Sequence, residues 1–193
     1  LSDREFKIAV LRNYNETQDN TEMEFRILSH KFLNEIKVIK QKLAEILKCE
    51  INTQWNAALV DVGARWIVLQ AVNAEAVLDS QPDFAALKEH DLEMKVTGAT
   101  VFGFHENNDE QKHIEVRSFA PSCGINEDPV CGSGNGSVAS FIRYYGILPA
   151  QNDVVLSSQG GAVGRDGQLQ LELYQDKILQ NNKKSQYHSA RTD

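Results

Sequence analysis

The sequence predicts an α+β fold in which a curled, mostly antiparallel sheet wraps around one central helix at about 134–145. Many short apolar runs with branched side chains alternate with turn residues, as strands do. Two or three helical segments are charged on one side, which places them on the outside of the sheet. The remaining helix carries its only firm charge at Arg143, so other parts of the chain must surround it.

The first third of the chain predicts two strands, a helix and a hairpin. Strands are expected at 6–11 and 23–28. From 32 to 49, apolar residues recur at helical spacing with lysines opposite, which indicates a helix packed on the sheet. The apolar runs 57–62 and 66–72 flank a short turn that contains glycine, so they are expected to form a hairpin.

The middle of the chain predicts two short helices followed by two strands. The helices are expected at 74–80 and 83–89, separated by Pro82. The strands are expected at 96–104 and 113–119, on either side of a polar tip.

Two further strands, at 154–157 and 169–173, are expected after the central helix, with glycine-rich turns beside them. The chain is polar from residue 181 onward, and we expect a disordered tail at 179–193.

Composition excludes several classes of partner. The net charge of −7 and the pI of about 5.3 disfavour nucleic acids and anionic membranes. No apolar run approaches the ~18 residues of a membrane span. Three sparse cysteines without metal-ligand spacing indicate a reducing, cytoplasmic location and no bound metal.

The stretch 126–140 carries the chemistry. It opens with Glu127 and Asp128, continues through Cys131 and alternating glycines, and leads into the central helix, which Gly146 ends. The first N–H groups of a helix have no partner within it, and its dipole favours negative charge there. The stretch therefore predicts a site for a carboxylate or another small anion. The alternative is a tight loop that enters a packed helix, because the pattern matches neither common phosphate-binding motif.

Each polar group in this stretch has two interpretations. Ser133 and the N–H groups of Gly132, Gly134 and Asn135 bind a carboxylate or an oxyanion, or Ser133 only caps the helix. Asp128 orients a substrate or a water, or it only caps the turn.

A cysteine and two arginines complete the set of candidates. Cys131 is a base or nucleophile with a pKa lowered by the helix N-terminus, or it is a small, inert, buried side chain. Arg117 and Arg65 neutralise an anionic substrate or pair with surface carboxylates, and we expect the pairing for both.

The same residues resemble a known family. Arg117-x-Phe119-x-Pro121, then Gly124-Ile125, then Glu127-Asp128-Pro129-x-x-Gly132-Ser133 is similar to the signature of the phenazine-biosynthesis PhzF-like family, and Gln159-Gly160 with Gly164-Arg165 resembles the strands that follow it. The likeness covers roughly residues 1 to 175. The family is related to diaminopimelate epimerase, so the resemblance implies one half of a two-domain fold, each half being a sheet rolled around a helix.

The resemblance also implies a function. Members isomerise or epimerise small carboxylated molecules by moving a proton, without a cofactor, in a cleft between the two halves. By position, Asp128 and Ser133 match the active-site Asp and Ser. Cys131 occupies a position where PhzF-like proteins often carry Thr, while Cys131-Gly132-Ser133-Gly134 matches the setting of a catalytic Cys in the epimerases.

The chain departs from the family in lacking the N-terminal domain with its catalytic Glu. We therefore expect 1–30 to belong to or link from that missing domain, and 31–178 to be the C-terminal PhzF-like domain. The hypotheses are an isomerase that is inactive without a complementing half, a silent half-domain that binds an anion or a partner, and a cysteine-dependent racemase. A lone half would also expose apolar surface, so a homodimer is possible.

Overall fold

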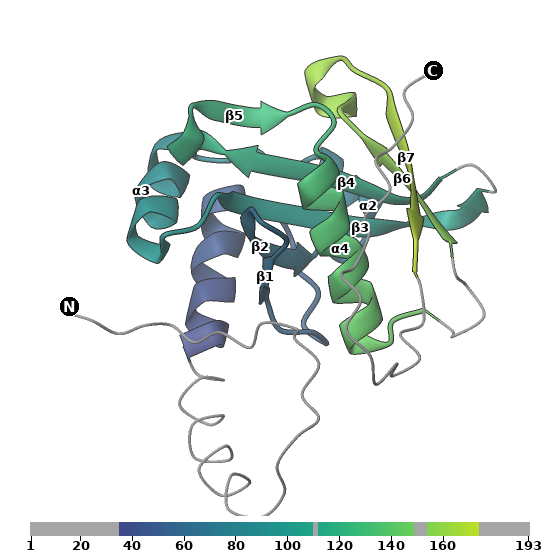
Figure 1. Ribbon diagram of the computed structural model, residues 1–193, viewed down its shortest axis with the longest axis horizontal. Helices are drawn as coiled ribbons and strands as arrows, with labels where there is room; N and C mark the ends of the chain where they lie inside the picture. Colours follow the sequence, from purple (N-terminus) through teal and green to yellow (C-terminus); the bar gives the residue numbers. More distant parts are fainter. Residues whose placement is uncertain (1–34, 110–111, 149–153, 174–193) are drawn as a thin grey trace, which may run out of the picture.

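The computed structural model of the protein describes residues 35–109, 112–148 and 154–173. Three predicted segments lie outside these residues: the strands at 6–11 and 23–28 and the tail at 179–193. The described part is one seven-stranded sheet with helices against it (Figure 1).

The sheet is mixed, with antiparallel pairs in the majority. Its strands run in the order β1 (Ala58–Asp61), β2 (Arg65–Gln70), β3 (Gly98–Asp109), β4 (Lys112–Ala120), β6 (Val154–Gln159) and β7 (Gly167–Glu172), and β5 (Ile125–Asp128) pairs with β4. The pairs β2–β3 and β4–β6 are parallel and the other four are antiparallel. The predicted α+β class with a mostly antiparallel sheet is confirmed.

Helices cover both faces of the sheet. The helix over 35–47, α2 (Ala74–Leu78) and α3 (Phe84–Met94) contribute to one apolar cluster, and α4 (Gly132–Tyr145) contributes to the other (Figure 1). Strand alternation explains the division: in β2, Ile67 and Leu69 join the first cluster, while Trp66 and Val68 join the second. The central helix of the prediction is therefore α4, which packs along the inner face of the curled sheet.

The structure extends several predicted elements. The helix expected at 83–89 continues to Met94, where Lys95 ends it in a left-handed conformation, with φ of 54°. Strand β5 was not predicted, because its sequence, Ile-Asn-Glu-Asp, has little strand character. Pairing with β4 holds it in the sheet, and a short 3-10 turn at Pro121–Cys123 leads into it.

The largest difference concerns the glycines at 132, 134 and 136. The sequence places the start of the helix at about 134, after a glycine-rich turn, but α4 begins at Gly132 and includes all three. None of these glycines has a positive φ, so the stretch is regular helix. Gly146 ends α4 with φ of 60°, as predicted. Among the described residues, no helix is both long and apolar enough to cross a membrane.

Candidate active site

The first turn of α4 leaves two backbone donors open. Cys131 is the N-cap residue: its Sγ accepts the N–H of Gly134 at 3.3 Å, and its carbonyl accepts the N–H of Asn135 at 3.0 Å. The N–H groups of Gly132 and Ser133 donate to no other group in the described part of the chain. Gly132 is exposed and Ser133 half-buried. Of the three N–H groups that the sequence predicted as donors, only that of Gly132 therefore remains available to a ligand in this conformation, and the N–H of Ser133 is open beside it.

Gly134 explains why the helix can lie so close to the sheet. A Cβ atom at this position would lie 2.3 Å from Ser118 Oγ and 3.1 Å from Thr100 Oγ1. A Cβ at Gly132 or Gly136 would meet no atom within 4 Å. The middle glycine is thus required by packing against β3 and β4, whereas Gly132 and Gly136 leave space around the turn.

The hydroxyl of Ser133 is oriented by a tryptophan. Trp66 Nε1 donates to Ser133 Oγ at 3.1 Å, across from β2. This contact occupies an acceptor position of Ser133, so the hydroxyl hydrogen is free to turn toward Cys131 Sγ, 3.6 Å away, or toward a ligand. Capping the helix was the alternative role predicted for Ser133, but the N-cap residue is Cys131.

Cys131 is buried and its thiol is hard to ionise. Only 5 % of the residue is exposed, and this burial raises the pKa of the thiol. Hydrogen bonds from Ser133 and Gly134 favour the thiolate but are outweighed, and the nearby carboxylate of Asp128 raises the pKa further. Of the two interpretations of Cys131, the one that needs a lowered pKa is contradicted and the small, buried side chain is supported, because desolvation exceeds the effect of the helix N-terminus.

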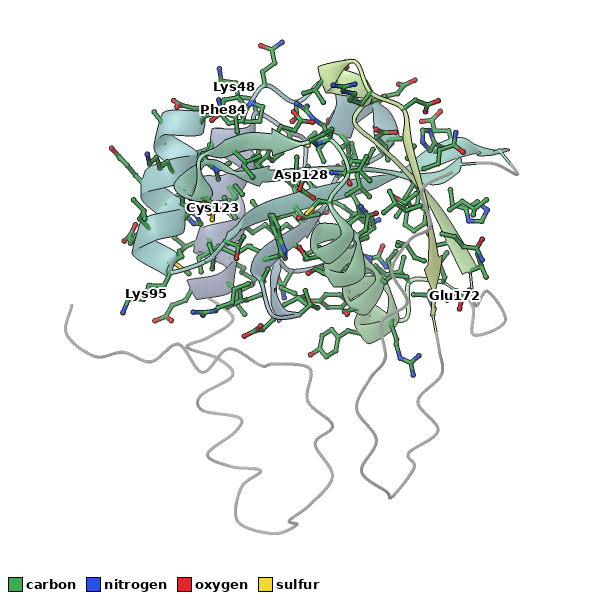
Figure 2. All side chains as sticks on the ribbon, turned by 45° about the horizontal axis from the view of Figure 1, so that its top comes forward. Lys48, Phe84, Lys95, Cys123, Asp128 and Glu172 are labelled. Atoms are coloured by element: carbon green, nitrogen blue, oxygen red, sulfur yellow. The ribbon has the colours of Figure 1, made fainter. Side chains whose placement is uncertain are left out.

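Asp128 lies at the end of β5, beside the N-terminus of α4 (Figure 2). It is half-buried, and its Oδ1 accepts the N–H of Val130 at 3.1 Å, which closes a turn between the strand and the helix. Its charge and its hydrogen bonding both act on the thiol of Cys131. The structure therefore brings Asp128, Cys131 and Ser133 together, as the sequence predicted from their proximity in the chain.

A buried amide network supports this turn. Asn135 is 1 % exposed; its Nδ2 donates to Cys131 O at 3.0 Å and to Gln159 Oε1 at 2.7 Å, and its Oδ1 accepts from Ser157 Oγ at 2.6 Å. These contacts use both donors of the Asn135 amide and one of the two acceptor positions of its oxygen. Sequence analysis assigned no role to Gln159 or Ser157, although Gln159-Gly160 was part of the family resemblance.

Arg117 forms a buried pair rather than a surface one, which corrects the prediction. Its Nε and Nη2 donate to the two carboxylate oxygens of Glu127 at 2.9 and 2.7 Å. Its Nη1 donates to the carbonyl and hydroxyl of Ser80 at 2.7 and 3.1 Å. The side chains of Arg117 and Glu127 are only 6 % and 5 % exposed. Arg117 lies in β4, so the pair joins β4 to β5, which carries Asp128. The bonds from Arg117 to Ser80 attach the loop before α3 to the same two strands.

A shallow cavity of about 530 Å³ lies beside β5 and is separate from the α4 turn. Its lining comes from the loop before α3, from the first residue of α3, from β4 and β5, and from the turn after β6: Ser80, Gln81, Pro82, Phe84, Arg117, Asn126, Glu127 and Val163. Of the candidate residues, only Arg117 lines it, and Asp128, Cys131 and Ser133 do not.

Metal ligands and disulfides are not found in the described residues. No group of three or more His, Cys, Asp or Glu side chains there is arranged to hold a metal ion. Cys49, Cys123 and Cys131 are all free thiols.

Comparison with protein families places this geometry in a known context. The model of the PhzC-PhzF family, described as phenazine biosynthesis-like protein, matches residues 7–189. An uncharacterized isomerase of Schizosaccharomyces pombe is 34 % identical over 116 residues, which cover 59 % of this chain and 61 % of that protein. An uncharacterized isomerase of Clostridium acetobutylicum is 28 % identical over 143 residues, covering 72 % of this chain and 47 % of the relative.

Solved structures agree with the sequence relatives. A PhzF-family phenazine biosynthesis protein from Enterococcus faecalis superposes with a TM-score of 0.51 and 26 % identity, over 69 % of this chain and 44 % of that one. A PhzF-family protein from Bacillus anthracis has a TM-score of 0.56 at 18 % identity, over 68 % of this chain and 45 % of that one, which shows the fold alone. The chain thus spans about half the length of these relatives.

Proposed function

Because the chain belongs to the PhzC-PhzF family of phenazine biosynthesis-like proteins, we propose that it is the substrate-binding half of a cofactor-independent isomerase. The substrate is a small metabolite that bears a carboxylate, and the reaction moves a proton within it. The observation that carries this proposal is the open first turn of α4, where the N–H groups of Gly132 and Ser133 have no partner among the described residues.

The turn has the chemistry of an anion site. Two unpaired N–H groups at a helix N-terminus attract a carboxylate or an oxyanion. The Ser133 hydroxyl adds a third donor, because Trp66 already occupies one of its acceptor positions. Gly134 and Asn135, whose N–H groups are already bonded, shape the turn and do not contact the substrate.

Asp128 narrows the class of substrate. A carboxylate beside the anion site repels a simple acid, but it accepts a hydrogen bond from an amino or hydroxyl group. The arrangement favours an acid that carries such a donor close to its carboxylate. We assign Asp128 to orienting this donor.

The neutral thiol of Cys131 argues against the racemase alternative. A cysteine base must be a thiolate, and burial opposes its formation. We assign Cys131 the role of N-cap and wall of the site. If Cys131→Thr abolished activity in the complete enzyme, the racemase would regain support.

The principal acid/base group belongs, in this proposal, to a complementing half like the part of the longer relatives that this chain does not match. Exposed apolar side chains on β5, in the turn that follows it and in the turn after β6 support such a contact: Ile125, Val130 and Val163 are 48 %, 42 % and 44 % exposed. We expect the chain alone to bind substrate without turning it over.

Two measurements test these claims. The first is a nuclear magnetic resonance titration of the amide signals of Gly132 and Ser133 with acetate, lactate and alanine. We expect both signals to shift, and lactate and alanine to bind more tightly than acetate. Ser133→Ala should weaken binding roughly tenfold, because a hydrogen bond to a charged group is lost. Ser140→Ala, which removes a hydroxyl bonded to Gly136 O further along α4, is the matched control.

The second measurement separates an isomerase from a silent binder. The chain is mixed in D₂O with the N-terminal half of a longer family member, and bound acids are analysed for deuterium at the carbon next to the carboxylate. Deuterium uptake supports the isomerase. Binding without uptake by any acid supports the silent half-domain, and no binding by the α4 turn contradicts both.

A further inference from the structure

Among the residues that the structure describes, Gln159 is the one side chain that contacts both ends of the turn between β5 and α4. It is the last residue of β6 and only 1 % exposed. Its Nε2 donates to the carbonyl of Asp128 at 2.7 Å, and its Oε1 accepts the N–H of Cys131 at 3.1 Å. The same oxygen accepts Asn135 Nδ2 at 2.7 Å. A neutral amide therefore spans the turn from its first residue to the helix cap.

The backbone of the β6–β7 hairpin fits against the same turn. A Cβ atom at Gly160 would lie 2.7 Å from the carbonyl oxygen of Pro129, and one at Gly167 would lie 2.5 Å from Val130 Cγ2. Both positions therefore need glycine for the hairpin to approach the turn. The glycines supply close packing, and Gln159 supplies the polar contacts that fix the turn along the hairpin.

The two backbone groups that Gln159 contacts require opposite hydrogen-bonding partners. The N–H of Cys131 requires an acceptor and the carbonyl of Asp128 requires a donor, and a primary amide provides both in one rigid plane. Asn135 and Ser157 extend the network but do not reach Asp128. The placement of Asp128 relative to the open N–H groups of α4 thus depends on a residue more than twenty positions further along the chain.

We propose that Gln159 is the positioning residue of this site, holding Asp128 and the Cys131 cap of α4 in the arrangement that a carboxylate ligand requires. The significance of that arrangement rests on the proposed function. The positioning itself is measurable without any ligand, through the accessibility of the Cys131 thiol.

The substitution Gln159→Glu tests the donor specifically. One carboxylate oxygen retains the acceptor position toward Cys131 and Asn135, while the other faces the Asp128 carbonyl in place of a donor. Two acceptors then oppose each other at the 2.7 Å separation that the hydrogen bond now occupies. Gln159→Met, of similar length and uncharged, removes all three hydrogen bonds and keeps the test valid if the charged variant does not fold. Gln168→Glu, on the exposed side of β7, is the matched control.

The readout is the rate at which iodoacetamide modifies each cysteine at pH 8, resolved by peptide mass spectrometry. The molecule contains its own references, because Cys123 is exposed while Cys49 is buried with a pKa raised to about 11. In Gln159→Glu and Gln159→Met, we expect Cys131 to react at least ~10-fold faster, as the turn opens locally, with Cys123 and Cys49 unchanged. Gln168→Glu should leave all three rates unchanged.

Two results would overturn the proposal. One is a Cys131 rate within about twofold of the unmodified protein in both variants. The other is an equal acceleration of Cys49, which would show general loosening of the fold. Titration of the Gly132 and Ser133 amide signals with acetate then tests whether this positioning affects ligand binding. We expect both variants to bind acetate more weakly than the unmodified protein. If the unmodified protein binds no carboxylate, the proposed function fails while the cysteine comparison still decides the role of Gln159.

Discussion

The N-termini of α3 and α4 are built differently in the same molecule. At α3, one carboxylate oxygen of Asp83 accepts the N–H groups of both Ala85 and Ala86 at 3.1 Å, so a charged cap neutralises the helix end. At α4, the uncharged thiol of Cys131 accepts one N–H, and those of Gly132 and Ser133 have no partner among the described residues. The first arrangement stabilises a helix, and the second leaves its positive end available.

This difference teaches what distinguishes a structural helix end from a candidate binding site. Both helices pack on the same sheet, and both begin with an N-cap side chain. Only α4 combines a weak cap with a close-packed glycine and a buried amide network below it. Such support fixes the geometry of the open donors, which is what binding without reorganisation requires.

The largest expected effect comes from filling the close contact at α4. Gly134→Val would place side-chain atoms against Ser118 and Thr100, and we expect it to lower the free energy of unfolding by about 3 kcal/mol. Gly136→Ala, two residues away in open space, should raise it by ~0.5–1 kcal/mol, because alanine favours helix. Urea unfolding measures both values. Changes of the same sign would show that the close approach of α4 to the sheet is not a constraint.

The buried side of α3 offers the next test. The N-terminus of this helix is capped by Asp83, but two polar side chains on its inner face, His90 and Asp91, are buried without hydrogen-bond partners among the described residues. Asp91 is fully buried, and its oxygens have no hydrogen-bond partner among the described residues; the nearest ring nitrogen, His90 Nδ1, is 3.8 Å away. Burial raises the pKa of Asp91. The folded state therefore prefers the protonated carboxyl, and the stability due to this preference is lost as the pH rises through the folded pKa.

Asp91→Asn removes this dependence. At pH 7 we expect it to raise the free energy of unfolding by about 1–3 kcal/mol. Folding of the original protein must either bury the unpaired charge of Asp91 or protonate it, and asparagine requires neither. Below the ordinary carboxyl pKa of about 3.9 the difference should vanish. Urea unfolding of both proteins between pH 3 and 8 measures the difference. A difference that is constant with pH would contradict the assignment.

The cap of α3 is expected to matter less than its interior. Asp83→Ala removes the acceptor of two N–H groups and should cost about 1 kcal/mol of stability. Asp83→Asn keeps an acceptor without the charge and should cost only part of this. Thermal unfolding of the pair separates the hydrogen bonds from the charge. Equal losses would mean that charge alone stabilises this end.

The smallest expected effect directly compares the two ends. Ser133 and Ala85 are each the second helical residue after the cap. Ser133→Asp places a carboxylate at the open end of α4, where it should add ~0.3–1 kcal/mol and abolish acetate binding. Ala85→Asp should change stability little, because Asp83 already occupies that end. Acetate binding that survives Ser133→Asp would place the anion elsewhere.

Much of the fold follows from local sequence, but the support of the site does not. Hydrophobic spacing predicted the hairpin at 57–72 and the strands that became β3, β4, β6 and β7. Glycine signals located the end of α4 but misplaced its start, because the approach to Ser118, not a turn, requires Gly134. Asp128, Cys131 and Ser133 could be grouped because they are neighbours in the chain.

The contacts that the sequence could not reveal are those between distant segments. The bond from Trp66 to Ser133 and those from Gln159 to the turn depend on strand order and on which way each strand faces. The raised pKa of Cys131 depends on burial, which the local pattern of a helix start does not report. Strand β5 escaped prediction because its pairing with β4 and the anchoring of Glu127 by Arg117 are tertiary effects.

The parallel pairing of β4 with β6 also sets the order in which this region can be completed. Helix α4 lies in the crossover between these two strands, and Gln159 stands at the far end of β6. During synthesis the helix and its cysteine leave the ribosome before β6 does. A nascent chain that ends before residue 154 therefore lacks the side chain that bonds the N–H of Cys131 and the carbonyl of Asp128, and the turn before α4 gains these bonds only when β6 joins the sheet.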